Sequence, residues 1–170
     1  MNQVEKVLEF GLPPVAIITF GLPGSGKTTL LKSKCFGIPI ISADDIKPQL
    51  PGWDEKNPSA VHQQSVKIAK ELVEQAVKEK VNFAFDSGSI NTKYSRNLFR
   101  MIKESGYSIH LIVFDIPLEV CLERNRRRSF QVPEDDILSK NEEKSEALLA
   151  LMPYVDTIET VTLEDQTQNF

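Results

Sequence analysis

The chain has 170 residues, of which 41% are apolar and 26% are charged, a composition typical of one globular domain with its own core. It contains no apolar run of about 18 residues, so we expect no membrane-spanning helix. The net charge of −4 disfavours a protein that coats long nucleic acid through a broad basic face. The first residues lack the basic start and apolar block of a secretion signal, so we expect a cytoplasmic location.

Apolar strands alternate with helices along the chain. Residues 15–20 form a continuous apolar run, typical of a buried parallel strand, and residues 27–34 read as a helix. The later predicted elements are a strand at 38–42, a helical turn at 44–50, a helix at 57–80, a strand at 81–85, a helix from 91 or 92 to 106, a strand at 109–114, a helix at 117–128, one or two helices within 133–152 and a strand within 154–163. This alternation predicts an α/β fold with a parallel sheet of about five strands flanked by helices.

We expect a single domain over residues 1–170. Residues 1–13 read as an N-terminal extension, and the polar segment 164–170 reads as a frayed tail. The two cysteines, Cys35 and Cys121, fit no metal-ligand spacing and are expected to be free thiols. His62 and His110 are isolated in the sequence, so we expect each to be a surface or packed residue and not a catalyst.

The segment GLPGSGKTT, residues 21–29, follows the first predicted strand, opens a helix and matches G-x-x-x-x-G-K-[ST]. Glycines let the backbone turn its N–H groups toward phosphate oxygens, Lys27 supplies a charge to the outer phosphates, and the Thr28 hydroxyl can bind Mg²⁺. The pattern predicts binding of ATP, or another nucleoside triphosphate, with Mg²⁺. The expected nucleotide-binding residues are Gly21, Pro23, Gly24, Ser25, Gly26, Lys27, Thr28 and Thr29.

Two aspartates could help to hold the water shell of the metal. Asp86 and Asp115 each end an apolar strand, in FAFD and IVFD. The sequence does not choose between them, and at least one is expected to be only a helix or turn cap.

The segment ISADDIK, residues 41–47, follows the second strand, where ligands bind in open α/β folds. Asp44 is placed to accept a proton from an attacking hydroxyl, and Lys47, one helical turn later, could hold a phosphate of the acceptor. The alternative is that Asp44 or Asp45 caps the short helix. The phosphate-binding pattern upstream favours the catalytic role for Asp44.

Four of the six arginines lie at positions 124–128. Arg124 and Arg128 are four residues apart, as on one helical face, and could clamp the transferring phosphoryl group. Arg126 and Arg127 are expected to be solvated. The alternative for one or two of them is a basic helix end that the helix dipole favours. Trp53, in PGWDEK, could stack on a base or pin its loop to the body, and the sequence leaves both open.

The chain resembles the P-loop polynucleotide 5′-hydroxyl kinases, of the phage type and of the kinase module of bacterial RNA-repair enzymes, and more distantly the zeta-toxin-like kinases. The segments that carry the resemblance are GLPGSGKTT (21–29), ISADDIK (41–47), FDSGSIN (85–91), GYSIHLIVFDIPLEVCLERNRRR (106–128) and VPEDDI (132–137). The resemblance implies an adenylate-kinase-like P-loop fold with a helical lid, and phosphoryl transfer to the 5′-hydroxyl end of DNA or RNA. It also admits a phage-encoded origin in a bacterial host.

The resemblance further implies roles for single residues. Lys27 and Thr28 would be the phosphate-loop pair, Asp44 the general base and Arg128 a lid residue that contacts the transferring phosphate. Arg124 lies one turn before Arg128, and Asp86 would stand at the acceptor site or near the metal. Lys47 occupies the place of an arginine that usually holds the acceptor phosphate, and it cannot make the same bidentate contact.

Two other functions remain as alternatives. The first is a small-molecule kinase of the same fold, with a nucleoside, nucleotide or sugar-nucleotide acceptor. The second is a nucleotide-binding switch without turnover, which would be expected to lack the acceptor-side groups Asp44, Arg124 and Arg128. The oligomeric state is not predicted.

Overall fold

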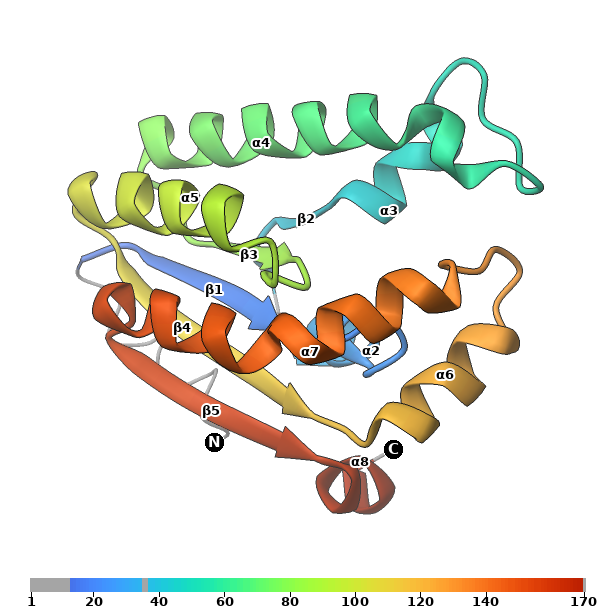
Figure 1. Ribbon diagram of the computed structural model, residues 1–170. Coiled ribbons are helices and arrows are strands. Elements are labelled where there is room, and N and C mark those ends of the chain that lie inside the picture. Colours follow the sequence, from blue (N-terminus) through green and yellow to red (C-terminus); the bar gives the residue numbers. More distant parts are fainter. Residues whose placement is uncertain (1–12, 35–36, 170) are drawn as a thin grey trace.

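The computed structural model describes residues 13–34 and 37–169, and its centre is one parallel sheet (Figure 1). Its strands are β1 Val15–Phe20, β2 Ile40–Ser42, β3 Phe83–Asp86, β4 Ser108–Asp115 and β5 Thr157–Thr162. They lie in the order β2-β3-β1-β4-β5 and pair in parallel throughout. The α/β fold with five flanked strands is therefore confirmed.

The helices lie on both faces of the sheet (Figure 1). They are α2 Lys27–Lys34, α3 Ala43–Ile46, α4 His62–Glu79, α5 Thr92–Glu104, α6 Leu118–Arg126, α7 Glu134–Leu151 and α8 Leu163–Asn169, with 3₁₀ turns at Lys47–Gln49, Pro58–Val61 and Met152–Tyr154. The step from β1 to β2 runs one way across the sheet, and the later steps run the other way. Right-handed crossovers therefore place α2 on one face and α4, α5 and α7 on the opposite face.

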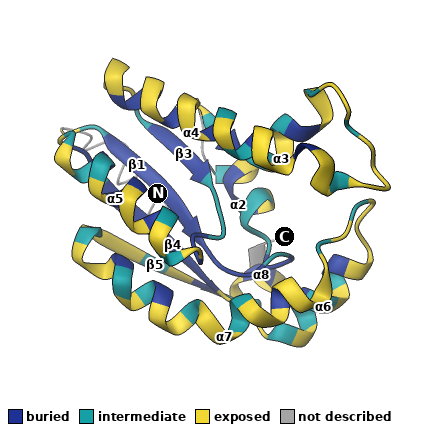
Figure 2. Ribbon diagram, turned by 45° about the horizontal axis from the view of Figure 1, so that its top comes forward, coloured by how far each residue is buried: buried dark blue, intermediate teal, exposed yellow. Residues whose placement is uncertain are grey.

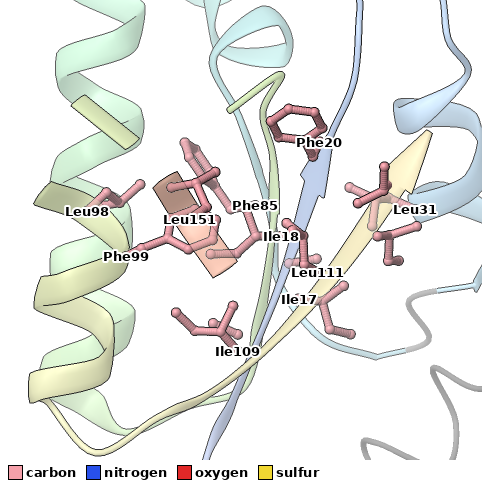
Figure 3. Close-up of a cluster of buried hydrophobic side chains, with 14 of the residues drawn as sticks. Ile17, Ile18, Phe20, Leu31, Phe85, Leu98, Phe99, Ile109, Leu111 and Leu151 are labelled. Carbon is pink, nitrogen blue, oxygen red and sulfur yellow. The ribbon is translucent and has the colours of Figure 1, made fainter. Parts of the chain in front are cut away.

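The core is built around β1, all six residues of which are buried. Ile18 packs with Phe99 of α5 and Leu151 of α7 on one side of the sheet, and Leu31 of α2 lies on the other (Figure 3). Each such side chain contributes about 1.5–3 kcal/mol when it leaves water. Figure 2 shows the result: β1, β3 and β4 are largely buried, whereas much of β5 and the outer sides of the helices are exposed.

Strand order decides which carboxyl ends meet. The strand β3 lies between β1 and β2, and Asp86 at its end is in register with Ser42 at the end of β2. Asp115 instead ends β4 on the far side of β1, is exposed and is in register with Thr162. The loop after β1, the end of β3 and the segment after β2 therefore share one edge of the sheet.

The predicted helix through Arg128 is too long, because α6 ends at Arg126. Asn125 is fully buried, and its amide donates to the Val132 carbonyl (2.8 Å) and accepts from the Val132 N–H (3.0 Å). These two bonds fold the chain into a turn over residues 127–133, here called the lid turn. Arg124 and Arg128 consequently do not share a helical face, contrary to our expectation.

The expectation of a frayed tail at 164–170 is wrong for the part that the structure describes. Residues 163–169 form α8. Asp165 accepts from the Thr162 N–H and hydroxyl, both at 2.7 Å, and so helps to start the helix. Gln166 is buried. The expected extension at 1–13 lies almost wholly outside the described residues, as does Cys35.

Candidate active site

The phosphate-binding loop, residues 21–29, joins the buried end of β1 to the start of α2. Gly24 and Gly26 have φ angles of +85° and +93°, which favour glycine. The loop also packs closely, since a Cβ on Gly24 would lie 2.4 Å from the carbonyl oxygen of Cys121 in α6. The glycines are therefore required by both backbone conformation and packing.

Replacing Gly24 by alanine is expected to weaken nucleotide binding at least tenfold, because the Cys121 carbonyl and the loop must move apart. The matched control is Gly106→Ala. Gly106 has a φ of +87°, and nothing lies within 4 Å of a Cβ built there. Both variants should lose about 1–2 kcal/mol of stability through backbone strain. Denaturant unfolding and nucleotide titration check this, and equal nucleotide affinity in the two variants would contradict it.

Lys27 lies at the start of α2 and curls back over the loop. Its Nζ donates to the Leu22 carbonyl at 2.7 Å. Burial lowers the pKa of Lys27 to about 8, and the positive charge of Arg128 acts in the same direction. The charges of Asp86 and Asp44 oppose this shift in pKa. A bound phosphate would favour the charged amine, so this lysine is suited to an anionic ligand.

Nucleotide binding is expected to take up a proton at pH 8–9. Lys27 is then partly neutral in the free protein, and bound phosphates would raise its pKa. The uptake should disappear below about pH 7, where the amine is already charged. Titration calorimetry in buffers of different ionisation enthalpy measures it. Lys27→Arg is the control, because arginine does not titrate in this range, and the same uptake in that variant would rule out Lys27 as the source.

Thr28 and Asp86 meet beside this lysine. The Thr28 hydroxyl donates to Asp86 Oδ2 at 2.5 Å. Burial raises the pKa of Asp86, while the hydrogen bond from Thr28 and the charge of Lys27 oppose that shift. Of the two aspartates that the sequence left open, Asp86 is thus the one that lies against Thr28.

This pair fits a magnesium ion that arrives with a nucleotide. Mg²⁺ is usually held by one or two protein oxygens together with phosphates and water. Among the residues that the structure describes, no group of three or more His, Cys, Asp or Glu side chains could hold a metal alone. Two oxygen groups at the edge of a phosphate-binding loop match the first arrangement.

Asp44 lies on the acceptor side, in α3. The cap of this helix is Ser42, whose hydroxyl accepts from the Asp45 N–H at 3.4 Å. Asp45 pairs on the surface with Lys32 at 3.1 Å. The alternative that an aspartate caps the helix is therefore excluded, and the Asp44 carboxylate is free for another partner.

That partner is Lys47. Its Nζ donates to Asp44 Oδ1 at 2.7 Å, and the lysine is only 8% exposed. Burial acts to raise the pKa of Asp44, but the hydrogen bond and charge of Lys47, with the charges of Arg128 and His62, outweigh it and lower that pKa. Asp44 is therefore an anion through the neutral range.

His62, which looked isolated in the sequence, is a neighbour of this pair. It begins α4, and burial and the charge of Lys47 lower its pKa, against the charge of Asp44. No spacing in the sequence links His62 to residues 41–47, because their proximity depends on how α4 packs against α3. His110 is buried in β4, with its Nδ1 2.7 Å from the Thr157 hydroxyl.

The structure separates the four clustered arginines. Arg126 pairs with Glu134 (2.6 Å) and Arg127 with Glu123, and all four side chains are largely exposed. Arg128, in the lid turn, has no hydrogen bond or ion pair from its side chain within the described residues. Its charge lowers the pKa of both Lys27 and Asp44, so it lies near both groups.

The Arg124 side chain, in α6, reaches the phosphate-binding loop. Its Nη1 lies 3.4 Å from the Gly24 carbonyl and donates to Gln166 Oε1 at 2.8 Å. The Gln166 amide in turn donates to the Ser25 carbonyl at 2.7 Å. Gln166, in the segment that we expected to be a frayed tail, therefore supports the phosphate-binding loop, and only the folded structure reveals this contact.

Comparison with known proteins places the chain in a family. A family model described as AAA domain matches residues 17–151, from β1 to the end of α7. The chain belongs to this AAA-domain family. A search of the curated proteins found no match to the chain.

Several solved structures share the fold. The PezAT chromosomal toxin-antitoxin system of Streptococcus pneumoniae matches with a TM-score of 0.69 and 18% identity, over 98% of this chain and 80% of that one. Shikimate kinase from Acinetobacter baumannii matches with a TM-score of 0.56 and 12% identity, over 95% and 90%. The Pnkp1/Rnl/Hen1 RNA repair complex matches with a TM-score of 0.62 and 21% identity, over 84% of this chain and 46% of that one.

At these identities the likeness shows the fold alone. A P-loop kinase-like fold supports nucleotide binding, usually with Mg²⁺, and phosphoryl transfer in general. The neighbours include a small-molecule kinase and an RNA repair complex, so the fold leaves the acceptor open. In the described part of the chain, no helix is both long and apolar enough to cross a membrane.

Proposed function

We propose that this protein transfers the γ-phosphoryl group of ATP to the 5′-hydroxyl end of DNA or RNA. The observation that carries the proposal is the grouping of Asp44, Lys27 and Arg128 at one edge of the sheet. The charge of Arg128 lowers the pKa of both Lys27 and Asp44, and the charge of Asp44 raises the pKa of Lys27. An ionised carboxylate beside two cations, all next to a phosphate-binding loop, is what transfer to a hydroxyl requires.

In the proposed reaction, Asp44 accepts the proton of the acceptor hydroxyl. The hydroxyl oxygen forms a bond to the γ-phosphorus of ATP, the bond from that phosphorus to the β-phosphate oxygen breaks, and ADP leaves. Lys27 and Arg128 stabilise the negative charge on the transferring group. Mg²⁺, held by Thr28 and Asp86 with the phosphates, would neutralise further charge.

Two features favour a nucleic-acid end as the acceptor. The segments at 21–29, 41–47, 85–91, 106–128 and 132–137 resemble those of polynucleotide 5′-kinases. The net charge of −4 suits a protein that grips terminal nucleotides only.

A small acceptor is the second candidate, and Lys47 favours it. A lysine offers a point charge instead of the bidentate fork of arginine, and here part of that charge is engaged by Asp44 at 2.7 Å. The likeness to a shikimate kinase and to a toxin-antitoxin system is compatible with this candidate at the level of fold.

Transfer of label from γ-labelled ATP with Mg²⁺ tests the proposal. The acceptors are 5′-hydroxyl DNA and RNA oligonucleotides, their 5′-phosphorylated counterparts as matched controls, nucleosides, sugar nucleotides and shikimate. Label on the 5′-hydroxyl ends is expected, with an acceptor affinity that falls as salt rises. Label on small acceptors alone would replace the proposed function with the second candidate.

A further inference from the structure

Two aromatic rings from different loops meet outside the core. Trp53 belongs to the segment 50–57 between the 3₁₀ turns at Lys47–Gln49 and Pro58–Val61, here called the acceptor loop, and Phe130 belongs to the lid turn. Their ring centroids are 5.5 Å apart, and the rings are nearly perpendicular, at 87°. Both residues are partly exposed, and neither belongs to the buried core nor packs against it. Their main aromatic contact is thus with each other and not with the body of the protein.

Both rings are carried on anchored backbone. In the acceptor loop, the Trp53 N–H donates to the Leu50 carbonyl (3.2 Å), and the Leu50 N–H donates to the Lys47 carbonyl (3.1 Å). In the lid turn, the paired bonds of Asn125 with Val132 close the segment that carries Phe130. Large apolar rings held on ordered loops away from the core usually serve recognition.

Trp53 and Phe130 each follow a residue of the proposed acceptor site in the chain. Trp53 follows Lys47 by six residues, and Phe130 follows Arg128 by two. The acceptor loop and the lid turn lie at the same end of the molecule, at the carboxyl side of the strands (Figure 1). The rings are therefore carried by the two segments that follow Lys47 and Arg128.

From this we propose that Trp53 and Phe130 form a subsite for the base of the 5′-terminal nucleotide of the acceptor, with the base stacked on Trp53. The inference rests on the proposed function, because it takes its ligand from a nucleic-acid acceptor. Stacking suits this role, since every base has a π-face and binding then needs no particular sequence.

The distance between the two rings limits how a base can bind between them. Rings 5.5 Å apart leave no room for a third ring between them, so a base that stacks between the two rings must displace Phe130 from Trp53. Phe130 lies in the same short turn as Arg128. Entry of the acceptor base between the rings would therefore couple its binding to the position of the lid arginine and favour transfer only when an acceptor is present.

Fluorescence of the wild-type protein gives a direct test, because Trp53 is the single tryptophan in the chain. The protein is saturated with Mg²⁺ and an ATP analogue that cannot be hydrolysed. It is then titrated with a 5′-hydroxyl oligonucleotide ending in thymidine, or with one whose 5′-terminal residue is abasic. A change in Trp53 emission with the first and not with the second is expected. An equal change with both, or no change with either, would overturn the subsite.

Kinetics with variants provide an independent readout. Trp53→Ala should raise KM for the thymidine-ended acceptor about 5- to 150-fold, leave KM for ATP unchanged and have little effect with the abasic acceptor. Trp53→Phe should restore most of the loss. Asp54→Ala is the matched control, since Asp54 caps the Lys56 N–H at 2.9 Å in the same loop but carries no ring. Equal losses on both acceptors would make Trp53 a structural residue and overturn the subsite. The absence of any labelled oligonucleotide would instead refute the proposed function.

Discussion

Asp44→Asn is expected to lower kcat for phosphoryl transfer by about 10²- to 10⁴-fold while nucleotide affinity stays close to that of the wild type. The carboxamide has nearly the shape of the carboxylate but cannot take a proton from the acceptor hydroxyl. It can still accept a hydrogen bond from Lys47, which approaches Asp44 Oδ1 at 2.7 Å. Single-turnover transfer and a separate nucleotide titration measure the two effects.

The matched control for Asp44→Asn is the same substitution at the next residue. Asp45→Asn removes the same charge one position away, where it faces the exposed Lys32 at 3.1 Å. It should leave kcat nearly unchanged. Protonation of Asp44 should require a pH below the ordinary aspartate range, because Lys47 and its neighbours lower the pKa of Asp44. Transfer by Asp44→Asn at the wild-type rate would show that another group is the base.

Arg128→Ala is expected to lower kcat by about 10³- to 10⁵-fold, the range for an arginine that stabilises a transferring phosphoryl group. Arg128 is near both Lys27 and Asp44, since it affects the pKa of each. Arg128→Lys should recover only part of the rate, because an ammonium cannot bridge two oxygens. Steady-state kinetics with saturating ATP and acceptor check the prediction.

Arg127→Ala is the matched control for Arg128. Arg127 lies in the same turn, is exposed and pairs with Glu123, so its loss should change kcat less than about twofold. A result in which Arg124→Ala lost more transfer than Arg128→Ala would reverse the proposed roles. The contacts of Arg124 with Gly24 and Gln166 place it as a support of the phosphate-binding loop.

Much of the fold could be predicted because it depends on neighbours in the chain. The apolar run at 15–20, the glycine pattern at 21–29 and the helix start at 91 or 92 each depend on residues only a few positions apart. The predicted and observed elements accordingly agree for β1 and α2, and other boundaries shift by a few residues. The predicted end of α6 was wrong because the helix is ended by two hydrogen bonds between buried Asn125 and Val132, which lies beyond the helix.

The composition of the candidate site depended on the tertiary structure. Asp86, and not Asp115, lies against Thr28 because β3 is inserted between β1 and β2, while β4 lies on the other side of β1. The support of the loop by Gln166 joins residues 141 positions apart in the chain. No local pattern predicts such a contact, because strand order and helix docking decide it.

The sequence by itself thus determined the class of fold, the phosphate-binding loop and Asp44 as the candidate base. Each of these follows from periodicity or from a short run of residues whose backbone and side-chain chemistry act together. Only the tertiary structure decided which aspartate lies with Thr28, that Arg124 and Gln166 support the phosphate-binding loop, and that Trp53 meets Phe130. The physical reason is that these pairings are set by the order of parallel strands and by loops that close across the sheet edge, where residues distant in the chain become neighbours.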